Sequence, residues 1–509
     1  MTDQLNQYLD ILSDFSEDDL VTNQYTIHTT YHSGSSSHTS LEASNPVTEN
    51  SLCVGMSFDT KESTVSCIKQ YHIDNGYRFA VVESKSEKFI CRCVDYKKDC
   101  PWRLRAAYSK RSLNWEIRKI DGSHTCLSTM QPADHVNLDS NQIGSIVMNS
   151  VKENPSIPIK SLVAEIKNRF GYSVSYDKAW NGKQKALAKE FGDWEESYNE
   201  LPRWYQAVQE SNPDTIIQCT GSPIQVSGQP DPSCYIMECV FWSFGPCIQG
   251  FNYFKPVVQV DGTFLTGRYQ GTLLTTLAQD GSRNIFPLAF AIMEGETKEA
   301  LIWFFQLLRE HVTPQSNLCL ITDRGKGILA ALQSEEVQWE ADGLQSVYCI
   351  YHIASNFNKK FKNHELKNWL KNMAYEVKQP ILDAKLAALR SYSPEVASWI
   401  DRIPLQKWTQ AYDGGSRFRH MTTNLAECMN SVLKRARSLA ICALIKATFE
   451  RTATWFVERG VKADFMLRAG HEYTKEINAI IRKNQQQAKM CQVRFLHMIT
   501  AYQCLLQLD

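Results

Sequence analysis

The order of apolar runs in the second half of the chain constrains the fold more than any other feature. A run at 257–260 ends at Asp261, and two further strand-like runs follow at 272–278 and 285–293. Continuous apolar runs of this length, bounded by polar residues, are typical of strands that lie inside a sheet. The sequence therefore predicts three consecutive strands from residue 257 onward.

Helices and strands alternate after these runs, and one of the later strands ends at Asp323. Three strands followed by alternating helices and strands is the order of an α/β domain of the RNase H-like type. The chain then continues as helix up to the segment that carries Glu427. The expected elements are a helix at 298–311, a buried strand at 318–322, a helix after residue 327, a strand at 346–350, nearly continuous helix at 353–408 and a helix at 424–437.

Size and charge exclude some classes of protein. With 509 residues, of which 43% are hydrophobic, the chain can bury the cores of several domains, and no apolar run is long enough to span a membrane. The N-terminus lacks a secretory signal, so the sixteen cysteines are expected inside the cell as thiols or metal ligands. Residues 1–50 hold eight acids and no Lys or Arg, which leaves the rest of the chain with a net charge of +8.

The first half of the chain divides by pattern into a tail, a sheet and a helical segment. Residues 1–50 are rich in Ser, Thr, Asn and Asp and are expected to be disordered. Alternating segments between polar turns then predict a small antiparallel sheet, and apolar residues at helical spacing predict helices after it. The expected strands are 77–82, 88–93, 102–108 and 114–120, and the expected helices are 143–153, 159–170 and 176–191.

Three cysteines and a histidine in the predicted sheet have the spacing of a zinc site. Six residues separate Cys93 from Cys100, twenty-three separate Cys100 from His124, and one separates His124 from Cys126. Tetrahedral zinc accepts this mixture of thiolates and imidazole, and a small sheet with little core gains stability from it. Cys91 is an alternative for the first ligand, and unrelated buried thiols with a surface histidine are the simpler explanation.

Two acids at strand ends predict a second metal centre. If the strands before Asp261 and Asp323 are neighbours, their carboxylates project to one place, where hard oxygen ligands favour Mg²⁺ or Mn²⁺. Glu427, on a predicted helix, is the candidate third carboxylate. Ions held in this way support phosphodiester cleavage and transfer. Each acid taken alone is more often a helix cap, a turn residue or a solvated side chain.

The motifs around these residues resemble those of Mutator-like transposases over about residues 56–460. Cys-Pro-Trp-Arg-Leu-Arg-Ala at 100–106 and His-Thr-Cys at 124–126 are similar to the WRKY-type zinc fold at the N-terminus of that family. The resemblance implies that Asp261, Asp323 and Glu427 are the catalytic triad and that a helical insertion, here at about 353–420, precedes the last acid. The other matching motifs are Pro-Val-Val-Gln-Val-Asp-Gly-Thr-Phe at 256–264, Gly-Arg-Tyr-Gln-Gly at 267–271, Phe-Pro-Leu-Ala-Phe-Ala-Ile at 286–292 and Thr-Asp-Arg-Gly-Lys-Gly-Ile at 322–328.

Basic residues in two places suit contact with DNA phosphates. One group lies on the predicted sheet, with two tryptophans among its members, and the other follows Glu427 on its helix. A solvated charged face is the simpler explanation of either group. The sheet group is Arg103, Arg105, Lys110, Arg111, Arg118 and Lys119 with Trp102 and Trp115, and the helix group is Lys434, Arg435 and Arg437.

The family also has a Cys-x2-His motif, which matches Cys349 and His352. Two ligands are too few for structural zinc, so the pair is expected to pack at a strand end as structural residues. Most relatives continue into a SWIM-type zinc finger, but Cys-x-Cys and Cys-x-His pairs are missing after residue 446 and residues 490–509 are apolar with helical period. The C-terminal segment is therefore expected to be helical and truncated relative to the family.

These patterns predict five regions. They are a disordered acidic tail at 1–50, a WRKY-like zinc-binding and DNA-binding domain at 51–130, a helical segment at 131–215 that could form a helix-turn-helix, an RNase H-like transposase domain at 216–440, and a helical C-terminal segment at 441–509.

The resemblance implies a nuclear DNA transposase that binds terminal inverted repeats as a homo-oligomer, cuts the DNA and joins it to target DNA, without membrane association. It would use structural Zn²⁺ and catalytic Mg²⁺ or Mn²⁺. The alternative is a domesticated, non-catalytic DNA-binding regulator similar to the far-red-impaired transcription factors, for which the acidic tail would serve as an activation segment. A nuclease of RNase H type that acts on RNA is disfavoured by the zinc domain and the long insertion.

Overall fold

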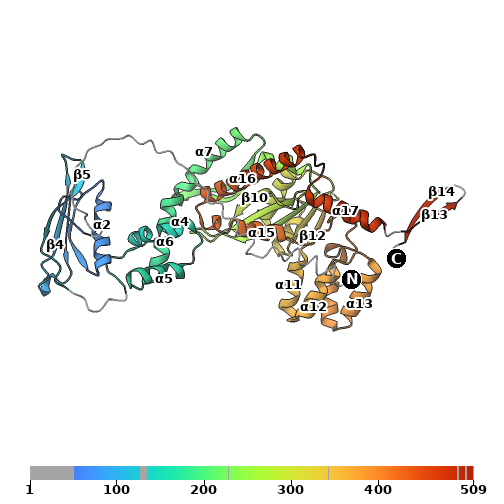
Figure 1. Cartoon of the computed structure of the whole chain (residues 1–509), viewed down its shortest axis with the longest axis horizontal. Coiled ribbons are helices and arrows are strands. Elements are labelled where there is room, and N and C mark those ends of the chain that lie inside the picture. The colour runs from blue at the N-terminus through green and yellow to red at the C-terminus, as the bar shows by residue number, and fades with distance from the viewer. Residues whose placement is uncertain are drawn as a thin grey trace. The chain divides into compact units, whose positions relative to one another are not determined.

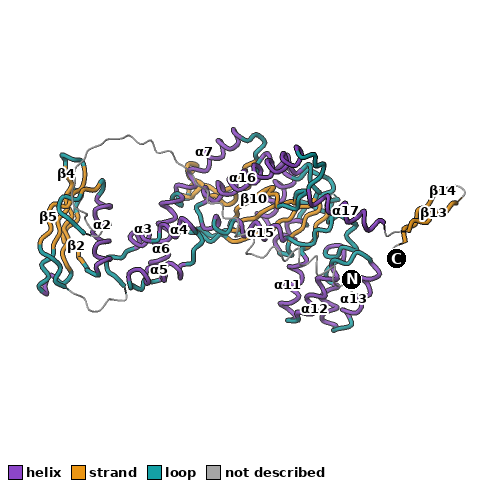
Figure 2. Tube along the Cα trace, in the orientation of Figure 1, coloured by secondary structure: helices purple, strands orange, loops and turns teal. Residues whose placement is uncertain are grey.

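Figures 1 and 2 show the computed structural model of the chain. The acidic segment at 1–50, for which disorder is expected, lies outside the described residues. The structure describes residues 51–126, 134–226, 228–341, 343–489, 492–498 and 501–507.

An antiparallel sheet begins the described chain, with its strands in the order β1-β5-β4-β3-β2. The four strands expected here are confirmed, with ends shifted by at most two residues. Side chains alternate across the sheet, so Cys91 and Cys93 lie in the core while Arg92 between them is exposed. The strands are β1 Ser57–Phe58, β2 Phe79–Ser84, β3 Lys88–Cys93, β4 Arg103–Ser109 and β5 Asn114–Asp121.

A helix that the sequence pattern did not indicate, α2 (Lys61–Asn75), packs against this sheet. Thr60 and Ser63 form a capping box at its start, and Gly76 ends it with a φ of 71°. Polar Thr64 and His72 are fully buried beside apolar Ile68. Because buried polar residues interrupt the apolar stripe, the helical period of α2 is faint in the sequence.

Five helices follow. Residues 159–170 and 176–191 are helical over the ranges expected, but the helix expected at 143–153 is two helices that meet at Val147. Gly182 lets α3 approach α6, since a Cβ on Gly182 would lie 2.3 Å from Ile143 Cγ2. The helices are α3 Ser140–Ile146, α4 Met148–Glu153, α5 Ile159–Phe170, α6 Tyr176–Phe191 and α7 Glu196–Ser211.

A seven-stranded mixed sheet forms the centre of the following domain, in the order β12-β11-β8-β9-β10-β7-β6. β9 runs antiparallel to β8 and β10, whereas β11 and β12 run parallel to β8. This order and these directions are consistent with an RNase H-like domain, extended at the β10 edge by an unexpected hairpin. The strands are β6 Ile216–Val226, β7 Gln229–Ser243, β8 Val257–Phe264, β9 Thr272–Gln279, β10 Ile285–Met293, β11 Cys319–Thr322 and β12 Gln345–Tyr348.

Asp261 lies inside β8, which corrects the expectation that the strand ends there. The pairing of β8 with β9 continues from Asp261, opposite Thr275, to Phe264, opposite Thr272. Pairing with β11 on the other side stops at Gln259. The polar residues after Val260 therefore belong to a strand that has lost one neighbour, which is why the apolar run is shorter than the strand.

Helices cover this sheet and share one apolar core with it. α9 (Lys298–Leu307) contributes Phe304 and Phe305, and α15 (Asn424–Val432) contributes Ala426 and Met429, all fully buried. The helix expected at 298–311 is α-helical to Leu307 and continues as a π-helical turn at Leu308–Val312. The helix expected after residue 327 is α10 (Lys326–Leu332).

The nearly continuous helix expected at 353–408 is four shorter helices. The first break is at Lys362, which has a φ of 50°, and Asn363 then caps the next helix by accepting a hydrogen bond from Leu366 N. Ser393 caps the last helix in the same way. Because the apolar residues keep their helical period across these short breaks, the breaks could not be seen in the sequence. The helices are α11 Ile350–Phe361, α12 His364–Ala374, α13 Gln379–Arg390 and α14 Pro394–Asp401.

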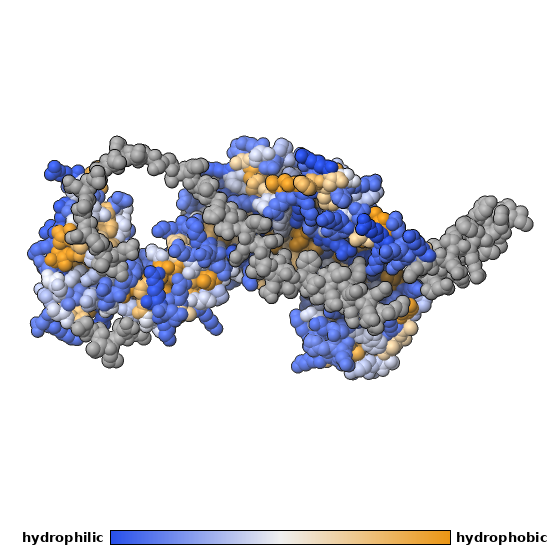
Figure 3. Space-filling view, viewed as in Figure 1, coloured by the Kyte–Doolittle hydropathy of each residue, from blue (hydrophilic) through white to orange (hydrophobic). Residues whose placement is uncertain are grey.

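The C-terminal segment is helical only in part. α16 (Ile441–Arg468) and α17 (Lys475–Lys489) agree with the expectation, but β13 (Gln492–Met498) and β14 (Ala501–Gln507) pair as antiparallel strands where helix was expected. A short apolar stretch does not separate helix from strand by periodicity alone. None of the helices in the described residues is both long enough and apolar enough to cross a membrane. Most of the surface in Figure 3 is hydrophilic.

Candidate functional site

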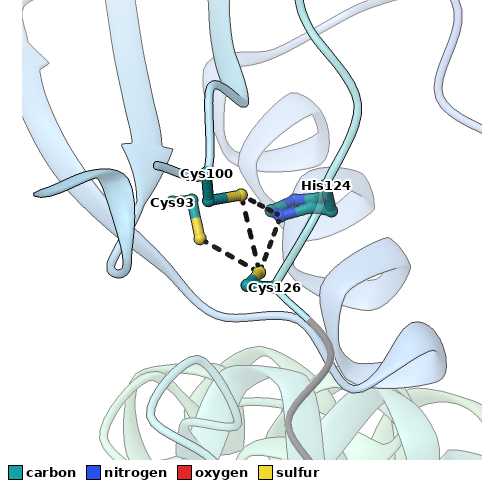
Figure 4. A group of neighbouring side chains, drawn as sticks. All are labelled: Cys93, Cys100, His124 and Cys126. Atoms are coloured by element: carbon teal, nitrogen blue, oxygen red, sulfur yellow. Dashed lines mark hydrogen bonds between the residues drawn. The ribbon is translucent and has the colours of Figure 1, made fainter. Parts of the chain in front are cut away.

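The four predicted zinc ligands come together at one end of the N-terminal sheet (Figure 4). Cys93 ends β3, Cys100 precedes β4, and His124 and Cys126 follow β5. The Sγ atom of Cys126 lies 3.4 Å from Cys93 Sγ, 3.6 Å from Cys100 Sγ and 3.4 Å from His124 Nδ1. A tetrahedral zinc ion would separate two thiolates by about 3.8 Å and a thiolate from an imidazole nitrogen by about 3.5 Å. The donor set and its spacing therefore fit structural zinc.

Cys91, the alternative first ligand, is not part of this group. Its side chain is fully buried among the apolar residues of the sheet, and burial raises the pKa of its thiol. A thiol in that environment stays protonated and behaves as a small apolar residue.

His72 on α2 fixes the orientation of the His124 ring, a role that the sequence did not reveal. His72 Nδ1 lies 2.7 Å from the carbonyl oxygen of Ile68 and must donate its hydrogen there. His72 Nε2 is then an acceptor for His124 Nε2, 3.2 Å away, and His124 Nδ1 keeps its lone pair for a metal ion. Burial lowers the pKa of His72 to about 3 and that of His124 to about 4, so both rings are neutral at pH 7.

Aromatic rings hold His124 from both faces. Tyr77 stacks on it with ring centres 4.1 Å apart, and Trp102 stacks with ring centres 4.6 Å apart. Trp102 is 3% exposed and Trp115 is 4% exposed, so neither belongs to the basic surface on which both were expected. Both tryptophan rings pack in the core of the domain, and the ring of Trp102 also orients the candidate ligand His124.

The exposed face of the same sheet carries basic residues in cross-strand pairs. Arg92 lies directly opposite Arg103, and Arg105 lies directly opposite Lys119. Like charges that face each other across strands destabilise a sheet, so such an arrangement suits a surface that binds an anion. Arg92 was not among the sequence candidates. The sequence feature that could have identified Arg92 is its position in the expected strand at 88–93, immediately before the candidate ligand Cys93.

The other basic candidates on this sheet are exposed, but several have acidic partners. Lys110 lies 3.4 Å from Glu87, and Arg118 lies 3.0 Å from Glu116. Arg111 is exposed in the turn between β4 and β5. The residues of the two cross-strand pairs, Arg92, Arg103, Arg105 and Lys119, are called the basic face of the sheet; of these, Lys119 also has an acidic partner, Asp121, 2.8 Å away.

Asp261 lies on β8, and Asp323 directly follows the neighbouring strand β11. The last paired residues of the two parallel strands are Gln259 and Ile321, and each aspartate comes two residues later in its own chain segment. Asp323 Oδ1 accepts a hydrogen bond of 2.9 Å from Gly325 N. A Cβ on Gly325 would lie 3.0 Å from the same oxygen, so this turn closes tightly around the carboxylate.

Glu427 lies in the first turn of α15, which packs against β8 and β9. Burial raises the pKa of Asp261 to about 6; His352 acts against this rise, and Asp323 and Glu427 add to it. Each of these groups is thus close enough to Asp261 to act on its charge. Within the described residues, only the zinc ligands form a set of three or more donors within 4.8 Å of one another, so the three carboxylates are more widely spread. Carboxylates separated in this way could be bridged by two divalent ions, since such ions lie about 4 Å apart and about 2.1 Å from their ligands.

Glu296 is a fourth acidic residue near Asp261 and Asp323, and no pattern in the sequence indicated it. It follows β10, and its Oε1 would lie 2.3 Å from a Cβ on Gly262, the residue after Asp261. Burial raises the pKa of Glu296, and Asp323 raises it further. The group is rich in oxygen donors, which fits Mg²⁺ or Mn²⁺ as the family resemblance implies.

Cys349 and His352 lie beside this acidic group. Cys349 is fully buried at the start of α11, and its Sγ accepts a hydrogen bond of 3.3 Å from Thr423 N, immediately before α15. A hydrogen bond with Cys349 raises the pKa of His352 to about 9, and Asp261 and Asp323 also raise it. In the described chain the pair joins no larger set of metal donors. Its contacts connect α11 to the helix that carries Glu427.

The basic residues after Glu427 divide into two kinds. Lys434 and Arg435 are exposed. Arg437 instead donates hydrogen bonds to Thr263 Oγ1 and, over 3.1 Å, to Phe264 O. Arg437 is therefore occupied in holding its segment against β8 and is removed from the expected DNA-contacting group.

Two family models match the chain. A MULE transposase domain matches residues 257–356, which include Asp261, Asp323 and His352, and a MuDR family transposase model matches residues 49–117. The chain thus contains a MULE transposase domain and a MuDR DNA-binding domain, as its motifs indicated. It matches no curated protein. Among solved structures, "Crystal structure of AFT2 in complex with DNA" is similar over 23% of this chain and 88% of that chain, with 16% sequence identity and a TM-score of 0.16.

Proposed function

We propose that this chain, which joins a MuDR DNA-binding domain to a MULE transposase domain, is a nuclear DNA transposase that cuts and transfers DNA strands at terminal inverted repeats. The observation that carries the proposal is the RNase H-like sheet order, in which β11, directly followed by Asp323, pairs with β8, which carries Asp261, while α15 with Glu427 packs against β8. Acids that lie close together repel one another unless they bind cations.

In this proposal Asp261, Asp323 and Glu427 hold two divalent ions. Bound Mg²⁺ or Mn²⁺ would activate a water or 3′-hydroxyl and stabilise the leaving oxygen of the phosphodiester. The protein's own residues would position the reactants: β8 and β11 are neighbouring parallel strands that lead to the two aspartates, and α15, which carries Glu427, packs against β8. Lys434 and Arg435, exposed just after α15, would hold the DNA backbone beside the acids.

The zinc domain would supply the initial contact with DNA. Its basic face presents four cationic side chains, Arg92, Arg103, Arg105 and Lys119, on strands held by the zinc ligands. The helical segment α3 to α6 could add a helix-turn-helix, and two copies would act together on paired DNA ends. The domain boundaries expected from the sequence, with α11 to α14 as the helical insertion, are part of the same proposal.

The test is strand cleavage and joining by the purified full-length chain on DNA that carries the inverted repeats of its own element. Mg²⁺ or Mn²⁺ should support cutting, EDTA should stop it, and Asp323→Asn should abolish it while repeat-specific binding persists. Asp464→Asn is the matched control, because Asp464 is exposed on α16, far along the chain from the acids, and pairs with Arg468, 2.8 Å away. Specific binding without cutting in any metal would instead support the non-catalytic regulator similar to the far-red-impaired family.

A further inference from the structure

We propose that Asn430 and Gln259 are positioning residues, which together clamp α15 to β8 so that Glu427 and Asp261 can share a divalent ion. The inference rests on the proposed function, since it concerns the same acids. Neither residue was singled out by the sequence, and neither is one of the acids.

The first contact fixes the carboxylate of Asp261. Asn430 Nδ2 donates to Asp261 Oδ2 over 3.1 Å. Asn430 follows Glu427 by three residues on α15, so both side chains lie on one face of the helix. The amide donor holds one carboxylate oxygen, and because it is neutral it does not cancel the negative charge that an ion requires.

The second contact fixes the start of the helix. Gln259 Oε1 accepts a hydrogen bond of 3.1 Å from Leu425 N, one of the first-turn donors that lack a partner inside a helix. The N-cap residue, Thr423, makes no side-chain capping hydrogen bond among the described residues. A glutamine on the neighbouring strand therefore takes the place of the missing cap. Gln259 is 3% exposed, so water does not compete for this bond.

The two contacts match in spacing. Gln259 and Asp261 are two residues apart on β8, a separation of about 7 Å on one face of a strand. Leu425 and Asn430 are five residues apart on α15, a rise of about 7.5 Å. Two bonds of equal spacing hold a helix against both sliding and tilting, whereas one bond would allow it to pivot. Glu427 lies between these two points, so its position relative to Asp261 is fixed from both sides.

Asn430 also has an unused acceptor. Its Oδ1 is buried and finds no hydrogen-bond donor in the described part of the chain. Mg²⁺ keeps several of its water ligands when it binds a protein. An amide that donates to a metal-binding carboxylate and retains a free acceptor suits the surroundings of a hydrated ion.

The experiment measures Mn²⁺ binding to the zinc-loaded, full-length protein from the electron paramagnetic resonance signal of free Mn²⁺, so that no DNA cleavage is required. Asn430→Ala and Gln259→Met should each raise the dissociation constant for Mn²⁺ about tenfold, the size of effect typical of residues that orient metal ligands. The double variant should lose less than the product of the single effects, because both residues hold one helix. Ser431→Ala, an exposed neighbour on α15, should leave binding unchanged.

Thermal unfolding without Mn²⁺ separates positioning from general damage. The clamp variants should unfold within a few degrees of the wild type and yet show a smaller rise in unfolding temperature when Mn²⁺ is added. Wild-type affinity in both clamp variants, with weakened binding in Asp261→Asn, would overturn this inference and leave the proposed site intact. Wild-type affinity in Asp261→Asn as well, or no Mn²⁺ binding by the wild type, would overturn the proposed metal site together with the clamp.

Discussion

The affinity of the protein for zinc should rise with pH. The slope of log affinity against pH is set by the protonation states of the four ligands, because it equals the number of protons that they release. Zinc binds thiolates and neutral imidazole, so each protonated thiol must release its proton. Burial raises the pKa of Cys93 and of Cys126, which makes each a protonated thiol at pH 7. Burial also acts to raise the pKa of Cys100, but hydrogen bonds from the backbone of Thr125 and Trp102, together with those from the side chains of Cys93 and Cys126, outweigh it and lower the value to about 7.

These states give the number of protons released. At pH 7 two thiols release one proton each, Cys100 releases about half a proton, and His124, with a pKa near 4, releases none, for a total of about 2.5. The affinity for zinc should therefore rise roughly 300-fold between pH 6.5 and pH 7.5. Replacing Cys126 by serine should lower the release by one proton.

The assay is calorimetric titration of the zinc-free full-length chain in two buffers of different ionisation enthalpy, with competition against a coloured chelator at each pH. Cys91→Ala is the matched control, because this buried thiol lies outside the ligand group and its loss should leave the proton count unchanged. A release of one proton or fewer would refute the assignment of three thiol ligands. A drop of one proton in Cys91→Ala would show that Cys91 is a ligand.

Three further predictions concern the zinc domain and the helical segment. His72→Phe removes the acceptor for His124 Nε2 and should weaken zinc binding about tenfold in chelator competition; unchanged affinity would refute the orienting role. Burial lowers the pKa of Lys183 to about 8, below its unfolded value, so the free energy of unfolding in urea should rise as the pH rises from about 8 to about 10.5; Lys183→Met should lose this rise, and an unchanged rise in the variant would contradict the role of Lys183. Arg103→Ala and Arg105→Ala should each reduce the slope of log affinity against log salt by about one for DNA of any sequence, measured by fluorescence anisotropy, and an unchanged slope would remove that residue from the DNA contact.

The order of elements in the central domain was predictable because buried strands leave continuous apolar runs. The runs at 257–260 and 285–293 lie in β8 and β10, and the sheet order follows that of the predicted type. The segment at 216–243 was missed because β6 and β7 are largely exposed over much of their length and leave no such run. Short breaks within the helices at 350–401 were missed because a change of chain direction need not interrupt apolar spacing.

The site could be predicted only where function depends on residue type at a fixed spacing. Cys93, Cys100 and Cys126 are visible in the sequence because few other roles require thiols in that pattern. His72 is 52 residues from His124, and its role arises from a contact that local periodicity does not record. Asn430 is 169 residues from Asp261 and is equally hidden. Residues that orient ligands depend on tertiary contacts, so the folded structure is needed to find them.

The distance along the chain between Asp261 and its partner Asn430 also determines how long after Asp261 the rest of the proposed site is synthesised. A ribosome adds about 5–20 residues per second, so the 169 residues between them take roughly 10 to 30 s. β8, β9 and β10 leave the ribosome early in that interval, while α15 is still to be made. Once Asp323 has been made, and until Glu427 follows, the nascent chain has the two aspartates without the glutamate. The proposed metal site therefore cannot be complete until the chain has been made as far as Asn430.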